Sequence, residues 1–271
     1  MSDNPANNYR ILLIGDSCTD KYVFGSCERL SPEDPVPIFV PNQKIDERPG
    51  MSSNVFSNMK SLGDEVVHIT HDEKIIKTRY VAEGYANLRN VLRVDQEPQI
   101  STISMESLPR NISSFDAVVI SDYDKGFLTH DSCKKICEIA NNNEVKVFVD
   151  SKKPDLSCFE NSILKINQFE QSRMKKLPQK YQLIITRGSR GAEYMGEIIP
   201  PFINRIVDEF GNRDVCGAGD TFLSGLVHEY LRTEGDIRKS IEFANKCAAI
   251  VVSKFGTSQI TRDDLDALEG R

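Results

Sequence analysis

Short apolar runs alternate with stretches of helical periodicity along most of the chain. One run, Tyr9 to Gly15, ends at a glycine followed by an aspartate, as expected for a buried strand that opens onto a site. The other strand-like runs are Glu65 to Thr70, Asp116 to Ser121, Val145 to Asp150, Ile163 to Ile166 and Leu183 to Thr186. Between them, Ser52 to Leu62 and Ser132 to Asn142 repeat apolar residues at helical spacing. This alternation predicts an α/β fold, with a mostly parallel central sheet and helices on both faces.

Two regions interrupt the alternation. Tyr22 to Pro49 is rich in proline and contains strand-like pieces around Val36 to Val40. Lys77 to Val94 has the pattern of two strands joined near Gly84 to Asn87. We expect these lid segments, about residues 22–49 and 77–94, to form a small β lid that projects from the main sheet.

The C-terminal third of the chain is predicted to be helical. One helix should run from Gly217 to about Tyr230, and another from Asp236 to about Phe255, with Asp236 as its N-cap. No internal repeat or low-complexity linker divides the sequence. We therefore expect residues 1–271 to form a single domain.

Charge and composition exclude several classes of function. The chain has 34 Lys and Arg against 40 Asp and Glu, a net charge of −6. Nucleic-acid binding is not expected, because neutralising phosphates requires a basic face. No apolar run reaches the roughly 18 to 20 residues of a membrane span, and the N-terminus lacks the pattern of a secretory signal. We expect a cytoplasmic protein that does not bind membranes.

The sharpest chemical signal is the turn Gly217-Ala218-Gly219, which leads directly into an apolar helix. Small residues allow successive backbone N–H groups to face one anion, and the N-terminus of the helix adds a favourable dipole. Asp220 follows at once and would repel that anion, unless its carboxylate accepts a proton from an attacking hydroxyl. The alternative is a glycine turn that only ends one element and begins the next.

The pattern from Asp214 to Asp220 resembles the signature of the ribokinase-like (PfkB) carbohydrate kinases, which transfer the γ-phosphate of ATP to a sugar hydroxyl. The resemblance implies a ribokinase-like fold, with Asp220 as the base. It also implies that the amides of Gly217, Ala218 and Gly219 stabilise the transferring phosphoryl group.

Other segments agree with this resemblance and extend the predicted site. Asn167-Gln-Phe-Glu170 resembles a motif linked to Mg²⁺ and phosphate, so Glu170 is expected to contact Mg²⁺ indirectly. The residues implied for sugar binding are Asp16, Asp20, Gly50 and Asn54. Those implied for nucleotide binding are Asn167, Thr186, Gly188, Gly191, Asn245 and Gly256.

Within that family, four segments are similar to the bacterial heptose 7-phosphate kinases. They are Arg29 to Pro37, Glu47 to Gly50, Ser121 to Gly126 and Lys254 to Ser258. The resemblance implies that the acceptor is the anomeric hydroxyl of D-glycero-β-D-manno-heptose 7-phosphate. A phosphorylated acceptor requires cations near the far end of the sugar. The candidates are Lys77, Arg79, Arg93, Lys125 and Lys152, of which Lys77, Arg79 and Lys152 are assigned to the acceptor site.

The chain also departs from the family pattern. After Gly63, a helix and strand usual in the family are missing, and Met51 replaces a glycine. The alternatives are therefore a kinase for another sugar or sugar phosphate, or a catalytically weak regulator that binds nucleotide or sugar phosphate. Because the missing segment should expose a flank of the sheet, we also expect two lids to pair in a homodimer.

Overall fold

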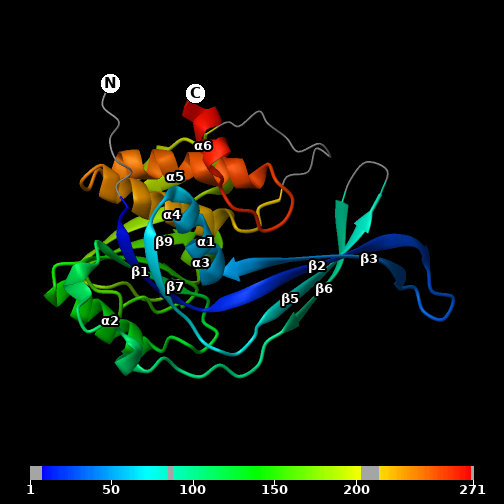
Figure 1. Cartoon of the computed structure of the whole chain (residues 1–271), viewed down its shortest axis with the longest axis horizontal. Helices are drawn as coiled ribbons and strands as arrows, with labels where there is room; N and C mark the ends of the chain where they lie inside the picture. The colour runs from blue at the N-terminus through cyan, green and yellow to red at the C-terminus, as the bar shows by residue number, and fades with distance from the viewer. Residues whose placement is uncertain (1–7, 85–87, 203–213, 270–271) are drawn as a thin grey trace.

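The apolar runs assemble into an eight-stranded sheet at the centre of the molecule (Figure 1). The computed structural model describes residues 8–84, 88–202 and 214–269. The strand order is β12-β11-β10-β9-β8-β7-β1-β4, and the pairs from β10 to β4 are parallel. The strands are β1 (Arg10–Gly15), β4 (Glu65–Ile69), β7 (Ala117–Asp122), β8 (Lys146–Ser151), β9 (Ser162–Asn167), β10 (Tyr181–Thr186), β11 (Ala192–Tyr194) and β12 (Glu197–Ile199).

Helices cover both faces of this sheet, as the alternation predicts. Along β1, Ile11 and Leu13 belong to one buried cluster, whereas Leu12 and Ile14 belong to another, because successive side chains point to opposite faces. The helices α1 (Ser52–Leu62), α4 (Ala218–Arg232) and α5 (Ile237–Val252) contribute to the first cluster, and α2 (His130–Asn142) contributes to the second. Two shorter helices are α3 (Gln168–Arg173) and α6 (Arg262–Glu269).

A separate four-stranded sheet forms the lid and extends away from the main body (Figure 1). Its order is β3-β2-β5-β6, with strands β2 (Ser17–Leu30), β3 (Pro37–Met51), β5 (Ile76–Glu83) and β6 (Leu88–Gln96). The prolines of β3 are tolerated because β3 is an edge strand, where a missing N–H disrupts less pairing. The turn predicted near Gly84 to Asn87 falls largely on residues 85–87, outside the described residues.

Several element boundaries differ from the sequence expectation for local reasons. The second helix begins at His130 rather than Ser132, because Thr129 caps it by accepting from the Ser132 N–H. The region from Tyr22 to Pro49 contains two long strands, not only the piece around Val36 to Val40. Asp236 is confirmed as an N-cap and accepts from the Lys239 N–H, but the helix ends at Val252.

The chain passes directly from the main sheet to the lid after β4. Residues 70–75 contain no helix, so β4 remains the edge strand of the main sheet. This short connection corresponds to the segment expected to be missing after Gly63. In the described ranges, no helix is long and apolar enough to cross a lipid bilayer.

Candidate active site

The glycine turn positions the first backbone amides of α4. Gly217 has φ 77°, a left-handed conformation, and a Cβ there would lie only 2.8 Å from Nδ2 of Asn54. Glycine therefore satisfies both the backbone and the space available. The N–H of Ala218 donates to the carbonyl of Val215, at 3.2 Å. The next two amides, of Gly219 and Asp220, have no acceptor within the helix and are suited to bind an anion.

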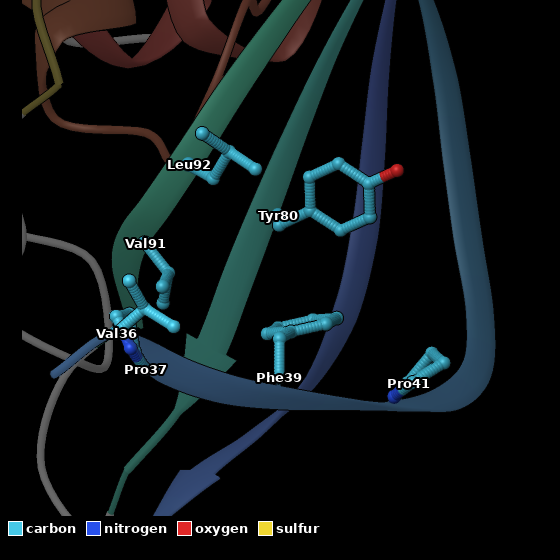
Figure 2. A pocket seen from close by; sticks show the side chains of 7 residues that line it. All are labelled: Val36, Pro37, Phe39, Pro41, Tyr80, Val91 and Leu92. Carbon is cyan, nitrogen blue, oxygen red and sulfur yellow. The ribbon is translucent and has the colours of Figure 1, made fainter. Parts of the chain in front are cut away.

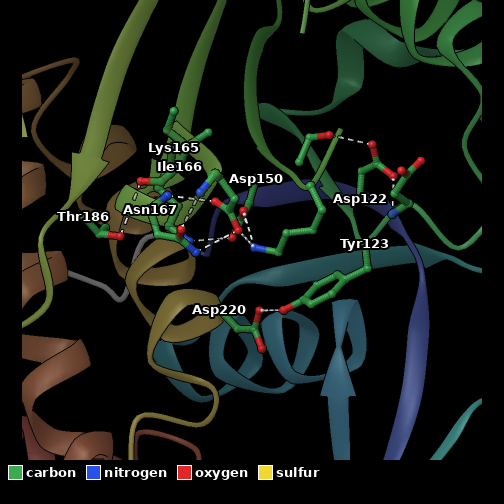
Figure 3. Close-up of polar contacts among 12 residues, drawn as sticks. Asp122, Tyr123, Asp150, Lys165, Ile166, Asn167, Thr186 and Asp220 are labelled. Atoms are coloured by element: carbon green, nitrogen blue, oxygen red, sulfur yellow. Dashed lines mark hydrogen bonds and ion pairs between the residues drawn. The ribbon is translucent and has the colours of Figure 1, made fainter. Parts of the chain in front are cut away.

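Asp220 lies in the first turn of α4 with both carboxylate oxygens engaged, and Figure 3 shows its contact with Tyr123. Oδ1 accepts from the hydroxyl of Tyr123 at 2.6 Å, and Oδ2 accepts from Nδ2 of Asn54 at 3.0 Å. Burial raises the pKa of Asp220 above its ordinary value, although the two donors partly oppose that shift. A buried carboxylate with a raised pKa is well suited to accept a proton.

A network of charged groups lies beside this carboxylate, at the carboxyl ends of β8 and β9 (Figure 3). Asp150 pairs with Lys165 at 2.6 Å and with Lys152 at 3.2 Å, and Lys152 also pairs with Glu170. Burial alone would raise the pKa of Asp150, but the two ammonium groups outweigh it and lower that pKa. Asp150 is therefore an ionised centre between two cations.

Asn167 and Glu170 form the N-terminal cap of α3. Oδ1 of Asn167 accepts from the Glu170 N–H at 2.9 Å, while Oε2 of Glu170 accepts from the Asn167 N–H at 2.8 Å. Nδ2 of Asn167 also donates to Oε1 of Glu170, at 2.8 Å. The motif thus has a structural role, because it begins a short helix at the end of β9.

The same two residues fit a magnesium ion only in a particular way. Among the described residues, no group of three or more His, Cys, Asp or Glu side chains could hold a metal ion. One carboxylate and one amide suit an ion held mainly by nucleotide phosphates and water. Glu170 is therefore compatible with the indirect contact expected from the sequence.

The residues expected to bind sugar lie around the base of the lid. Asp16 is fully buried, and its Oδ2 accepts from the Tyr123 N–H at 2.7 Å. Within the described residues, no partner is found for its Oδ1. Burial and the neighbouring Asp122 raise the pKa of Asp16. Oδ1 of Asp16 is thus a candidate acceptor for a sugar hydroxyl.

Asp20 is instead engaged by the protein. Its Oδ1 pairs with Arg79 at 2.5 Å, and its Oδ2 accepts from the Thr257 hydroxyl at 2.7 Å. A Cβ at Gly50 would lie 2.5 Å from Oδ2 of Asp20, so glycine allows the two lid strands to approach here. Arg79 also donates to Sγ of Cys216. In this arrangement Asp20 and Arg79 connect the lid to the turn before α4.

The other two candidate cations flank the ring of Tyr123. Nζ of Lys77 lies 5.4 Å from the ring centroid, and Nζ of Lys152 lies 5.1 Å from it. Lys152 pairs with the carboxylates of Asp150 and Glu170, as described above. No carboxylate pairs with Lys77 in the part of the chain that the structure describes. Lys77 is therefore the most available of the three for an anionic substrate.

The residues expected to bind nucleotide are spread over three neighbouring segments. Thr186 ends β10, and Gly188 and Gly191 turn the chain with φ 58° and 90°. Asn245 donates to the carbonyl of Pro200 at 3.0 Å, and the Gly256 N–H donates to Asp214 at 3.1 Å. These contacts shape the backbone, while the nucleotide contacts themselves remain predictions.

Sequence reasoning missed four residues that complete the site. Tyr123 lies in a segment used only as a family resemblance, and Asp150 only ended a strand-like run. Lys165 interrupts the apolar run Ile163 to Ile166, and this lysine in a buried strand was a usable signal. Thr257, like Tyr123, lies in a segment used only as a family resemblance, and its contacts with Tyr22 and Asp20 depend on the tertiary structure.

Comparison with known protein families matches residues 52–264 to the pfkB family carbohydrate kinases. Bifunctional protein HldE of Campylobacter jejuni strain RM1221 is 32% identical over 299 residues, covering 94% of this chain and 64% of that protein. The HldE protein of Aliarcobacter butzleri is 31% identical, with 94% and 63% covered. The chain thus spans less than two thirds of these relatives. Because each alignment is longer than the chain, the relatives contain residues that this chain lacks.

Solved structures share the fold at low sequence identity. Phosphofructokinase-2 from Escherichia coli in complex with potassium has a TM-score of 0.67 at 14% identity, covering 97% of this chain and 100% of that one. Arabidopsis thaliana ribokinase complexed with ribose and ATP has a TM-score of 0.64 at 14% identity, covering 97% and 99%. The predicted fold class, a mostly parallel α/β sheet with a small β lid, is confirmed.

Proposed function

The chain belongs to the pfkB family of carbohydrate kinases, and we propose that its acceptor is the anomeric hydroxyl of D-glycero-β-D-manno-heptose 7-phosphate. Family membership makes it a phosphotransferase that binds a sugar and ATP. The heptose assignment is supported by the four segments similar to heptose 7-phosphate kinases and by the relatives named HldE. The observation that carries the proposal is the buried Asp220 carboxylate beside the first amides of α4, with Lys77 nearby.

Asp220 acts as the general base in this proposal. Its carboxylate takes the proton of the anomeric hydroxyl as that oxygen attacks the γ-phosphorus of ATP. The bond between the γ-phosphorus and the bridging oxygen of ADP breaks, and ADP leaves with that electron pair. The amides of Gly219 and Asp220 stabilise the charge on the transferring phosphoryl group.

Asp16 and Asn54 position the sugar. The unpartnered Oδ1 of Asp16 accepts a hydrogen bond from a sugar hydroxyl. Asn54 Nδ2 already donates to Asp220 and its Oδ1 accepts from Nδ2 of Asn58, so Asn54 orients the base and can contact the sugar through the second N–H of Nδ2. Oriented contacts of this kind place the attacking oxygen in line with the phosphoryl group.

Asn167 and Glu170 are the residues proposed to hold a Mg²⁺–nucleotide complex. A bound magnesium ion offsets the negative charge of the nucleotide phosphates. Glu170 would contact such an ion through water, since its oxygens are engaged by Asn167 and Lys152. Lys152 places a further positive charge at the same edge of the sheet.

Lys77 is proposed to distinguish a phosphorylated acceptor from a free sugar. Its ammonium lies 5.4 Å from the centroid of the Tyr123 ring, and the hydroxyl of that ring contacts the carboxylate that takes the proton. Lysine provides charge-assisted hydrogen bonds to phosphate that a free sugar cannot replace. This contact predicts a preference for an acceptor that already carries a phosphate.

The test is ADP release by the purified protein with a panel of sugars and sugar phosphates. We expect heptose 7-phosphate to exceed unphosphorylated heptose by at least about tenfold in kcat/KM, the scale of one charge-assisted hydrogen bond. Equal use of fructose, ribose or free heptose would assign the chain to another sugar. Binding of nucleotide or sugar phosphate without turnover of any acceptor on the panel would favour a catalytically weak regulator.

We also propose that two copies pair through their lids. An apolar groove of about 530 Å³ lies on the lid (Figure 2). It is lined by Val36, Pro37, Phe39, Pro41, Tyr80, Val91 and Leu92. Leu92 and Val36, which both line the groove, are more than half exposed. A two-fold axis would bring this same face of both copies together and cover the apolar side chains.

A further inference from the structure

A buried lysine lies beside the glycine turn. Lys165 is on β9, and its side chain is 2% exposed. A Cβ built on Gly219 would lie 3.0 Å from Nζ of Lys165. The ammonium group is therefore in contact with the turn whose amides are suited to bind an anion.

The described residues accept only some of the hydrogen bonds that the Lys165 ammonium group can donate. Its hydrogen bond goes to Oδ2 of Asp150, at 2.6 Å, and an ammonium group has three N–H donors. No second acceptor for Nζ is found among the described residues. Asp150 is itself shared with Lys152, so one carboxylate serves two cations. Leaving donors of a buried cation unpaired is unfavourable, which points to an additional anionic partner.

The glycine at 219 supports the same conclusion. Gly219 lies within α4 and, unlike Gly217, does not have a positive φ, so its backbone conformation does not require glycine. Alanine would also favour the helix more than glycine does. What glycine provides here is space, because a methyl group would press against Nζ of Lys165.

We propose that Lys165 is a further catalytic residue, whose ammonium contacts the transferring phosphoryl group together with the amides of Gly219 and Asp220. The inference rests on the proposed kinase function but not on the identity of the acceptor. Lys165 stays protonated and forms or breaks no covalent bond. It donates to a non-bridging oxygen of the γ-phosphate and stabilises the charge that the group carries during transfer.

The first experiment separates this role from a purely structural ion pair. Binding of ATP and of ADP is measured by calorimetry for the wild type, Lys165→Gln and Asp150→Asn. Lys165→Gln removes the charge but keeps an amide that can donate to Asp150, whereas Asp150→Asn keeps the ammonium. We expect Lys165→Gln to weaken ATP binding by about tenfold or more and to change ADP binding by less than about twofold, since only ATP has the γ-phosphate. Asp150→Asn should keep the preference for ATP over ADP.

Turnover provides the second measurement. With the best acceptor, Lys165→Gln should lower kcat by about 10²- to 10³-fold, the usual scale for losing one preorganised group that stabilises the transition state. Lys180→Met, which removes an exposed lysine charge far from the turn, is the matched control and should retain normal kcat. Gly219→Ala should also lower kcat in the wild type, and by a smaller factor when Lys165 is already glutamine.

Each outcome decides between the two roles. Loss of the ATP preference in both Lys165→Gln and Asp150→Asn would show that Lys165 acts only through the ion pair, and would overturn the proposal. An unchanged preference in Lys165→Gln would overturn it as well. If Lys165→Gln does not fold, the Gly219→Ala protein replaces it, and unchanged ATP preference and kcat in that variant reject the contact.

Two results distinguish a wrong acceptor from a wrong role for Lys165. Suppose that the wild type prefers ATP, that Lys165→Gln lacks this preference, and that no acceptor on the panel is phosphorylated. This result would support the role of Lys165 and reject the heptose as acceptor. A wild type that binds neither nucleotide would reject both.

Discussion

The hydroxyl of Tyr123 donates a 2.6 Å hydrogen bond to Oδ1 of Asp220, joining the end of β7 to the first turn of α4. The backbone N–H of Tyr123 donates to Asp16 at 2.7 Å. One residue therefore contacts both the proposed base and a carboxylate proposed to bind the sugar. Its burial, together with the nearby Asp220 and Asp150, raises the pKa of Tyr123 well above its ordinary value, so it remains a donor.

Asp220→Asn tests the base directly. The amide keeps the shape of the side chain but cannot take a proton, so turnover should fall by about 10²- to 10⁴-fold. Nucleotide and sugar binding, measured by calorimetry, should be retained. Near-normal turnover in a folded Asp220→Asn protein would remove Asp220 from the mechanism.

Tyr123→Phe should shift the pH dependence of the reaction. The Tyr123 hydroxyl lowers the pKa of Asp220, so its loss should raise that pKa further. A base with a higher pKa needs a higher pH to ionise, and the acidic limb of the kcat/KM profile should move to higher pH. Tyr9→Phe, which removes a hydroxyl at the amino end of β1 rather than at the carboxyl end where the site lies, serves as the control. An unmoved acidic limb in Tyr123→Phe would contradict the coupling.

Lys77→Met should affect the phosphorylated acceptor selectively. We expect kcat/KM for heptose 7-phosphate to fall by about tenfold or more, because one charge-assisted contact is lost, with the KM for ATP unchanged. Lys21→Met is a matched control, since Lys21 is on the lid but pairs with Glu47. An equal loss with free sugar would mean that Lys77 does not recognise the phosphate.

The proposed lid dimer is tested by light scattering at micromolar concentration. The wild type should have about twice the 30.5 kDa mass of the chain, and Leu92→Glu should shift it to the monomer, because a charge in an apolar interface is costly to bury. Ile198→Glu changes a similarly exposed apolar residue on β12 and should leave the dimer intact. A wild-type monomer, or a dimer insensitive to Leu92→Glu, would mean that the lids do not pair.

His68 should make the fold sensitive to mild acid. Burial, with a smaller effect of His71, lowers the pKa of His68 from 6.5 to about 4. Between pH 6.5 and 4, the unfolded chain therefore binds a proton at His68 that the folded protein does not bind. The free energy of unfolding should fall by up to about 1.4 kcal/mol per pH unit as the pH drops from 6.5 towards 4.

Urea unfolding at pH 7 and pH 5 measures this effect in the wild type and in His68→Gln. The contribution of His68 is fully present above pH 6.5, so the two proteins should differ in their loss of stability between the two pH values. An identical loss in both would assign the acid sensitivity to other groups.

Local patterns predicted most of the elements that carry the site. The spacing of Val55, Met59 and Leu62 predicts α1, and Asp236 predicts the start of α5, because periodicity and capping depend on neighbours in sequence. The short strands β11 and β12 and the helix α3 were not predicted. Each is shorter than the window over which periodicity can be recognised.

The α/β class, the family and the position of Asp220 after a glycine turn can be read from the amino-acid sequence, since these depend on adjacent residues. Which side chains meet that turn depends on contacts between distant parts of the chain. Tyr123 is 97 positions from Asp220, and Lys165 comes from a different strand from Tyr123, yet the carboxyl ends of parallel strands bring them together. Tertiary contacts also pair Arg79 with Asp20, whereas Lys77 meets no carboxylate among the residues that the structure describes. The partner of a charged side chain depends on distance and burial in the folded protein, and neither can be read from neighbouring residues in the sequence.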